Sequence, residues 1–309
     1  MPLPETRLLL AHAAQWETDA VVLGAPSSEL EQLGLDALSP IPDHEREHEA
    51  CVLYWPKARR RREYFVALGA ATAKTLVVVG HKRSGIKSAS KMLTSLGRIR
   101  TKEHGCHCQL LVLELSARAP LPQFKCWESS FEARDLKLVS LPGVFCDGRL
   151  DDASDLLLDH FEPPEVGSLL DLGCGAGVLG LWAKRASPAL CVTLSDVDSL
   201  AVESSRRSAG YNQLEVRCVV SDVYSALHER FDVIVTNPPF HQGVATDYDV
   251  TRRIISESPA HLTSRGELWL VANHFLPWRQ CLEQHFGEVE LVHASRRFKI
   301  WRARAARSS

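Results

Sequence analysis

The feature that most constrains the fold is an apolar run that enters a cluster of glycines and continues as a helix. It reads "LLDLGCGAGVLG", residues 169–180. Gly175, Gly177 and Gly180 satisfy the pattern G-x-G-x-x-G, in which glycines let the backbone approach a ligand at a helix N-terminus. A plain tight turn would also fit these letters in isolation. The strand, glycine loop and helix in this order favour an α/β ligand-binding fold.

The residues that follow repeat the alternation of strand and helix. Strand patterns are predicted at 166–172, 189–196, 214–222, 231–236 and 266–275, and helical patterns at 178–187 and 199–210. Residues 289–305 read as two final strands. Strands that alternate with helices predict a doubly wound, mostly parallel sheet, here with an antiparallel pair at its end.

The first half shows a shorter version of the same order. Strands are predicted at 19–24, 49–55, 75–81 and 108–117, and helices at 62–73 and 85–97. When the two halves are aligned at Pro56 and Pro238, Trp55 takes the position of Asn237. At the position of the glycine loop of the second half, the first half has a single glycine, Gly24. We interpret this as an internal duplication that gives two tandem Rossmann-like domains, the first of which has lost its loop residues.

Length and charge agree with two domains. A chain of 309 residues suits two folding units, and the two prolines in Ser116–Lys125 mark the expected linker. We predict a degenerate domain at 1–122 and a catalytic domain at 123–309. Their formal charges are +3 and −5, which sum to the −2 of the whole chain, so weak overall charge does not exclude a nucleic-acid partner.

Carboxylates end three successive strands. Asp171 precedes Gly173 in a D-x-G-x-G pattern, and a carboxylate there suits a cationic or amino-bearing ligand better than a pyrophosphate. Asp196 can accept both hydroxyls of a ribose, and Asp222 is a candidate for an adenine amino group. S-adenosylmethionine carries an ammonium, a sulfonium and a ribose diol but no phosphate, so these positions predict it as the cofactor, together with Gly173, Gly175 and Gly177.

The stretch "TNPPFHQG", residues 236–243, follows the fourth strand of the second half. The carboxamide oxygen of Asn237 and the carbonyl of Pro238 can accept hydrogen bonds from a planar NH₂ group, whose lone pair is otherwise delocalised. Two such acceptors favour a pyramidal nitrogen and stabilise the positive charge that develops as a methyl group arrives. Phe240 offers a face for a nucleobase, and Pro239 stiffens the loop. In isolation, Asn-Pro-Pro is an ordinary turn.

Basic residues cluster in "PKARRRR". This cluster is either a nucleic-acid-binding surface or simply a solvent-exposed charged surface. We favour contact with RNA phosphates for Lys57, Arg59, Arg60, Arg61 and Arg62.

The nine cysteines and the remaining histidines suggest no metal site. An odd number of cysteines scattered through apolar runs favours reduced thiols and a cytoplasmic protein. "HGCHCQ" packs its potential ligands too tightly for a tetrahedral site and fits a hairpin tip instead. The first residues lack the pattern of a secretory signal, and no apolar run is long enough to cross a bilayer, so we expect no membrane partner.

Several of these motifs together resemble those of a known family. "DLGCGAGVLG", "SDVD", "TNPPFHQG", "VANHFLPW" and "LPGVFCDGRLDDASDLLL" look like the bacterial 16S ribosomal RNA guanine-N2 methyltransferases of the RsmC type. The resemblance spans most of the chain and is weakest over residues 1–50. It implies two tandem methyltransferase-like domains, the first catalytically inactive, S-adenosylmethionine as methyl donor, and the small ribosomal subunit or its RNA as partner. His241 also follows the family pattern, where it would either position the base or cap the loop, and the family varies at Asp222.

The residues leave other functions open. An adenine-N6 or glutamine-N5 methyltransferase would use the same Asn-Pro-Pro chemistry, a nicotinamide oxidoreductase would use the glycine loop, and an RNA-binding module without activity would need only the basic clusters. We predict a methyltransferase of ribosomal RNA that acts in ribosome biogenesis, as a monomer. The motifs do not identify the guanine or distinguish naked RNA from an assembled subunit.

Overall fold

The computed structural model describes residues 2–13, 19–41, 47–145, 148–239 and 245–304. The chain forms two compact units, Met1–Glu128 and Ser129–Ser309. The division therefore comes after Glu128 rather than after residue 122, because the end of the linker packs on the first unit. The ring centres of Phe124 and Trp127 lie 5.9 and 5.4 Å from the ring centre of Tyr64. The Arg60 guanidinium also donates a hydrogen bond to the Trp127 carbonyl.

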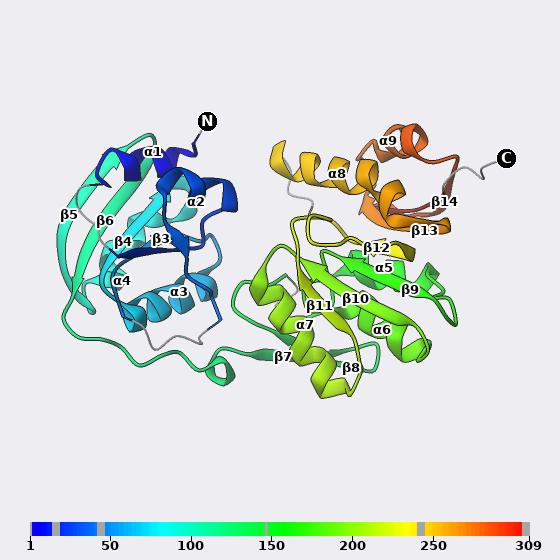
Figure 1. Ribbon diagram of the computed structural model, residues 1–309, viewed down its shortest axis with the longest axis horizontal. Helices are drawn as coiled ribbons and strands as arrows, with labels where there is room; N and C mark the ends of the chain where they lie inside the picture. The colour runs from blue at the N-terminus through cyan, green and yellow to red at the C-terminus, as the bar shows by residue number, and fades with distance from the viewer. Residues whose placement is uncertain (1, 14–18, 42–46, 146–147, 240–244, 305–309) are drawn as a thin grey trace. The chain divides into compact units, whose positions relative to one another are not determined.

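The first unit is a six-stranded sheet in the order β2-β1-β3-β4-β6-β5 (Figure 1). Its first four strands run parallel, and β6 and β5 are antiparallel to their neighbours. The strands are β1 Ala20–Leu23, β2 Asp36–Ala37, β3 His48–Tyr54, β4 Ala73–His81, β5 Gly97–Gly105 and β6 Cys108–Leu115, and the α-helices are α1 Pro4–Leu10, α2 Ser27–Leu33, α3 Arg59–Thr72 and α4 Ala89–Leu93.

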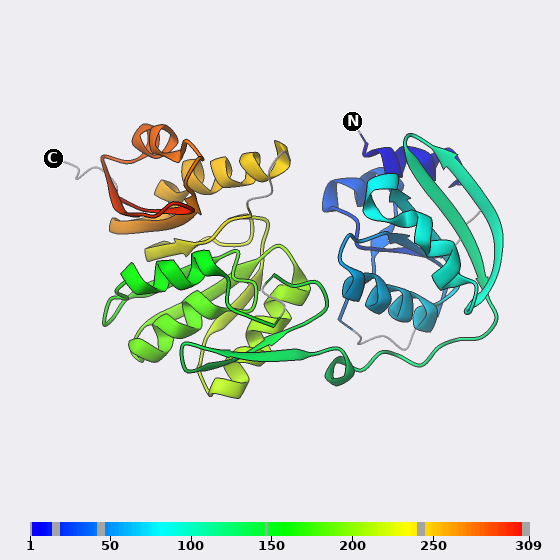
Figure 2. The ribbon, with the colours of Figure 1, turned by 180° about the vertical axis from the view of Figure 1, so that it is seen from behind.

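Helices cover both faces of this sheet. Leu8 and Leu9 of α1 share one buried cluster with alternate residues of the strands, such as Val52 and Val77, and α2 packs against the same cluster. On the other face, α3 approaches so closely that a Cβ on Gly69 would lie 3.4 Å from the Cys51 sulfur. Figure 2 shows α3 and α4 together on this second face.

The second unit is a seven-stranded sheet in the order β11-β10-β9-β12-β13-β15-β14. Five strands are parallel, and β15 and β14 form the antiparallel end. A separate hairpin pairs β7 Ser129–Ala133 with β8 Leu136–Ser140. The other strands are β9 Ser168–Leu172, β10 Cys191–Asp196, β11 Arg217–Val220, β12 Phe231–Thr236, β13 Leu262–Asn273, β14 Glu288–Ala294 and β15 Phe298–Arg304, and the helices are α5 Asp152–His160, α6 Val178–Ala186, α7 Ser199–Asn212, α8 Ala245–His261 and α9 Trp278–His285.

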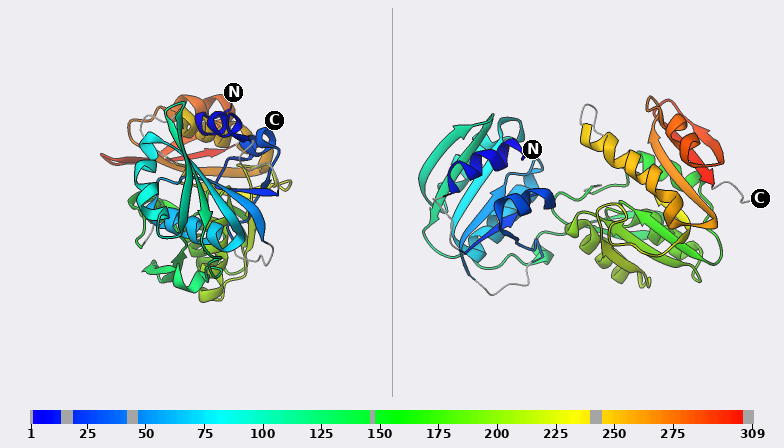
Figure 3. Two further views of the ribbon diagram at one scale, coloured as in Figure 1. Left: turned by 90° about the vertical axis from the view of Figure 1, so that its left-hand side faces the viewer. Right: turned by 45° about the horizontal axis from the view of Figure 1, so that its top comes forward.

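Alternate residues of these strands enter two different cores. Leu169 faces the cluster with α5, α6 and α7, whereas Leu170 faces the cluster with α8 and α9. This period of two is what a sheet covered on both faces requires. The turned view in Figure 3 shows the helices α8 and α9 on one side of the second unit. The predicted α/β class with two tandem, mostly parallel sheets is confirmed.

The two sheets repeat one topology. In the first unit, β1 lies between β2 and β3, and in the second unit β9 lies between β10 and β12. In both units the chain first adds strands on one side of this strand and then returns to pair on its other side. The next strand in each case, β3 or β12, ends immediately before Trp55 or Asn237. The topology therefore places these two residues at equivalent positions, as the predicted overlay of the two halves requires.

Some predicted elements differ from the structure. Residues 85–97 were expected to be one helix, but they form a 3₁₀ turn at Ile86–Ser88 and the short α4, and β5 begins at Gly97. The sequence patterns did not predict α8 or the β7–β8 hairpin. Cys106 and His107, both with positive φ, form the tight turn between β5 and β6.

Among the residues the structure describes, no group of three or more His, Cys, Asp or Glu side chains is arranged to hold a metal ion. Within the same residues, no helix is both long and apolar enough to cross a membrane.

We predict that Gly180→Ala destabilises the second unit. A Cβ at Gly180 would collide with Leu194 and lie 3.1 Å from the Asp171 Cβ, and overpacking of this kind costs about 1–3 kcal/mol. Gly210→Ala is the matched control, because a Cβ at Gly210, also helical, would meet nothing within 4 Å and should add roughly 0.5–1 kcal/mol of stability. Denaturant unfolding of both variants checks this; equal effects would contradict the close packing of α6.

Candidate functional site

The candidate site lies at the carboxyl ends of β9 and β12. After β9 the chain adds β10 and β11 on one side of the sheet, and it then returns to place β12 on the other side of β9. The strand order therefore reverses between β9 and β12. Open α/β sheets bind ligands at such a reversal. The Thr236 hydroxyl donates to the Leu172 carbonyl at 2.8 Å, which ties the two strand ends together.

The glycine loop begins where β9 ends. Gly173, Gly175 and Gly177 all have positive φ, at 75°, 55° and 88°. A Cβ on Gly173 would meet nothing within 4 Å and one on Gly175 only the Phe145 carbonyl at 3.9 Å, whereas one on Gly177 would lie 3.0 Å from the Ser205 hydroxyl. The first two glycines therefore border open space, and the third allows close packing within the protein.

Asp171 is buried beneath this loop, with 1% of its surface exposed. Its Oδ2 accepts a 2.9 Å hydrogen bond from the Gly180 amide in the first turn of α6. Its Oδ1 has no hydrogen-bond partner among the described residues. Burial raises the pKa of this carboxyl from 3.8 to about 7, although the Gly180 amide lowers it. An unpartnered oxygen at this depth suits a donor from a bound ligand.

The other two predicted acids lie at the next strand ends. Asp196 accepts from the amides of Gly175 and Asp198, at 3.0 and 2.9 Å, so it braces the glycine loop. Asp222 is exposed and forms an ion pair with Arg253 at 3.1 Å. An adenine amino group would therefore have to share the Asp222 carboxylate with Arg253.

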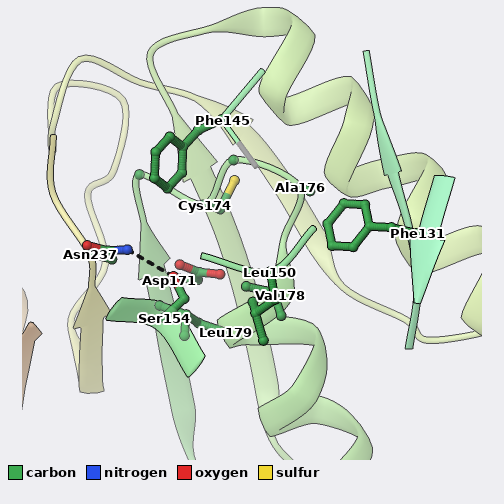
Figure 4. A pocket seen from close by; sticks show the side chains of 12 residues that line it. Phe131, Phe145, Leu150, Ser154, Asp171, Cys174, Ala176, Val178, Leu179 and Asn237 are labelled. Carbon is green, nitrogen blue, oxygen red and sulfur yellow. Dashed lines mark hydrogen bonds between the residues drawn. The ribbon is translucent and has the colours of Figure 1, made fainter. Parts of the chain in front are cut away.

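Asn237 brings the amine-binding motif to the glycine loop. Its side chain lines the same pocket as Asp171, Gly173 and Gly175 (Figure 4). The close-up also shows Phe145 and Phe131 on the pocket wall. The structure thus brings together motifs that lie more than 60 positions apart in the chain.

The remaining residues of the motif divide into two groups. Pro238 is buried and Pro239 is exposed. Phe240 and His241 lie outside the described residues.

Sequence patterns missed two residues of this site. The Asn237 amide nitrogen donates to Asp151 Oδ2 at 2.8 Å and to the Ser154 hydroxyl at 2.9 Å. These partners precede Asn237 by 86 and 83 positions. Their only local signal is the start of a helix, since Asp151 is the N-cap of α5.

The equivalent place in the first unit is filled by protein. A Cβ on Gly24 would lie 2.9 Å from the Phe65 ring, and Phe65 is only 4% exposed. Trp55, at the position of Asn237, is 5% exposed, and the Arg62 guanidinium lies 5.7 Å from the centre of its ring. Aromatic side chains thus occupy the space that the glycine loop leaves open in the second unit.

The basic cluster is less uniformly exposed than its charge suggests. Lys57 and Arg59 are exposed, and Arg59 forms an ion pair with Glu63 at 2.8 Å. Arg60, Arg61 and Arg62 are half-buried. All three are engaged within the unit: Arg60 with the Trp127 carbonyl, Arg61 with the Phe65 ring and Arg62 with the Trp55 ring.

Comparison with known proteins identifies the family. The profile of the family described as "Methyltransferase small domain" matches residues 135–302, and that of "Methyltransferase small domain N-terminal" matches residues 11–131. A curated relative from Stutzerimonas stutzeri (strain A1501), named "Ribosomal RNA small subunit methyltransferase C", is 40% identical over 261 residues, which cover 82% of this chain and 79% of the relative. The chain belongs to the ribosomal RNA small subunit methyltransferase C family.

Two further proteins support this membership. A methyltransferase C from Pseudomonas aeruginosa (strain UCBPP-PA14) is 36% identical over 97% of this chain and 99% of its own length. Among solved structures, the Thermus thermophilus "16S rRNA N2 G1207 methyltransferase (RsmC) in complex with AdoMet and Guanosine" matches with a TM-score of 0.77 and 27% identity, over 93% of this chain and 88% of that chain. The predicted resemblance to RsmC-type methyltransferases is confirmed.

We predict a pH-dependent contribution of Asp171 to stability. The raised pKa, about 7, means that the folded state holds this proton more tightly than the unfolded state. The stabilisation is therefore fully present below the ordinary pKa and is lost as the pH rises to about 7. Asp171→Asn cannot titrate, so the unfolding midpoint of the wild type, relative to this variant, should fall as the pH rises from about 4 to about 7. A constant or rising difference would contradict the prediction.

Proposed function

We propose that this chain transfers a methyl group from S-adenosylmethionine to the exocyclic N2 of a guanine in 16S ribosomal RNA. The observation that carries the proposal is one pocket lined by the glycine loop, Asp171 and Asn237, in which Asp171 Oδ1 has no hydrogen-bond partner among the described residues. The relatives named ribosomal RNA methyltransferases support the substrate class. The Thermus protein, solved in complex with AdoMet and guanosine, supports the donor and the acceptor.

The residues present fit the donor. S-adenosylmethionine, when bound, supplies an electrophilic methyl group on a sulfonium. Asp171 Oδ1 would accept from its ammonium, because this oxygen is buried and has no partner among the described residues. Gly173 and Gly175 leave the space a side chain would fill, with Gly177 completing the loop, and Asp196 would hold the ribose hydroxyls. Asp222 would meet the adenine amino group by sharing its carboxylate with Arg253.

The acceptor amine needs help to react, because its lone pair is delocalised into the base. Asn237 Oδ1 and the Pro238 carbonyl would each accept one of its hydrogens and hold the nitrogen with its lone pair toward the methyl group. The same two oxygens stabilise the positive charge that develops on nitrogen. No base has to act before attack, and the proton leaves after transfer. Pro239 would stiffen the loop, Phe240 would stack on the base, and His241 would lie on the substrate side.

The target base must leave its helix to reach this pocket, so we propose base flipping or an unpaired target. The first unit would act as a scaffold and RNA-docking domain. Lys57 and Arg59 are its exposed candidates for phosphate contact, and Arg60, Arg61 and Arg62 would contribute from half-buried positions. A cytoplasmic monomer belongs to the same proposal. The adenine-N6, glutamine-N5, oxidoreductase and inactive RNA-binding alternatives are not favoured by the family to which the chain belongs.

We predict that Asn237→Ala lowers methylation at least about 100-fold, because the variant loses a preorganised acceptor at the reacting nitrogen. Donor binding should stay within about twofold of the wild type. Small subunits lacking modifications, labelled donor and nucleoside analysis measure the first quantity, and calorimetry measures the second. Near-normal formation of N2-methylguanosine would overturn the role of Asn237, and a different methylated product would overturn the proposed substrate.

A second prediction concerns the number of donor sites. Because Phe65 and Trp55 are buried at the equivalent place in the first unit, titration calorimetry should give one S-adenosylmethionine per chain. Asp171→Asn should weaken this single site, since a neutral amide cannot pair with an ammonium. A stoichiometry of two, or a second site that survives Asp171→Asn, would contradict the proposed degeneracy of the first unit.

A further inference from the structure

The Asn237 side chain is held from outside its own loop. Its amide nitrogen donates two hydrogen bonds, to Asp151 Oδ2 at 2.8 Å and to the Ser154 hydroxyl at 2.9 Å. Both acceptors belong to the start of α5, and Figure 4 shows the bond to Ser154 on the pocket wall. A carboxamide nitrogen has two hydrogens, so these two bonds use all of its donors.

The arrangement fixes which end of the amide faces the substrate. If the side chain were flipped, its oxygen would lie against the Asp151 carboxylate, which is an acceptor and would repel it. With the nitrogen held by α5, the Oδ1 atom is the end left for a ligand. This orientation is the one that an acceptor for an amine requires.

The two partners are themselves held rigidly. Asp151 Oδ2 also accepts from the backbone amides of Ala153 and Ser154, both at 3.0 Å, and so caps α5. Ser154 is 4% exposed. Behind them, Leu157 and Phe161 anchor the helix in the core of the second unit. The position of the Asn237 amide is therefore tied to the core and not only to the Pro-Pro loop.

The charge of Asp151 has a further effect. A hydrogen bond from an amide N–H to a carboxylate draws electron density toward the amide oxygen. A more negative Oδ1 binds the amine hydrogens more strongly as positive charge develops on the nitrogen. This interaction strengthens during the reaction, so it lowers the barrier more than it tightens ground-state binding.

We propose that Asp151 and Ser154 are positioning residues that orient and polarise Asn237 for methyl transfer. The proposal rests on the proposed function, because it concerns how the same acceptor site works. It assigns to the first turn of α5 a role in the rate of the reaction, beyond its role as a helix start.

The test measures the maximal rate with saturating donor and unmodified subunits, alongside the donor dissociation constant and the KM for subunits. Ser154→Ala removes one acceptor and leaves the backbone cap, and we expect about a 10-fold lower rate. Asp151→Ser keeps a good N-cap but is too short to reach Asn237, and we expect about a 100-fold lower rate. Asp151→Asn keeps an accepting oxygen without the charge and should recover most of the loss seen with Asp151→Ser.

Asp152→Ser is the matched control. Asp152 is the next residue of the same turn, and its carboxylate pairs with Arg149 and Arg297 rather than with Asn237. We expect its maximal rate to stay within about twofold of the wild type. In all variants the donor dissociation constant and the KM for subunits should change less than about threefold, whereas a merely structural role would also alter donor binding and the unfolding midpoint.

The outcomes separate this inference from the proposed function. If Asn237→Ala is inactive while Ser154→Ala and Asp151→Ser keep the wild-type rate, the positioning role is wrong and the acceptor site stands. If Asp152→Ser loses as much rate as Asp151→Ser, the effect belongs to the helix turn and the inference is also overturned. If Asn237→Ala itself keeps its rate, the proposed function fails first.

Discussion

The close packing of α6 on β9 and β10 is the constraint on which the rest of the site depends. Gly180 has no side chain, so the helix comes close enough for its amide to donate to Asp171 at 2.9 Å. That bond holds one carboxylate oxygen and leaves the other without a partner among the described residues. It also satisfies a backbone amide in the first turn of α6, directly after the loop in which Gly173 and Gly175 line the pocket.

The two units show how one topology can keep or lose a ligand site. Both sheets reverse their strand order at the same place. In the second unit this place is bordered by glycines with nothing close to their missing Cβ atoms, and in the first it is packed by Phe65 and Trp55. Filling the space buries apolar surface, which stabilises a fold without requiring any change in its connectivity. In the first unit, the described residues at this place are therefore part of the core.

The sequence predicted the fold well where the hydrophobic pattern was regular. The runs before Gly173 and Asn237 are strands as expected, and Asp196 ends β10 as the pattern predicted. Prediction failed where local conformation decides. The helix expected at 85–97 is split into a 3₁₀ turn and the short α4. The β7–β8 hairpin turns through Arg134 and Asp135, both with positive φ, and arginine is uncommon at such a position.

The sequence by itself determined the fold class, the glycine loop and the chemistry available at Asn237, because these depend on periodicity and residue type over short spans. Only the tertiary structure decided how that chemistry is aimed. The amide of Asn237 is oriented by Asp151 and Ser154, more than 80 positions earlier in the chain. No local pattern encodes such a contact, since it exists only after α5 packs beside the ends of β9 and β12.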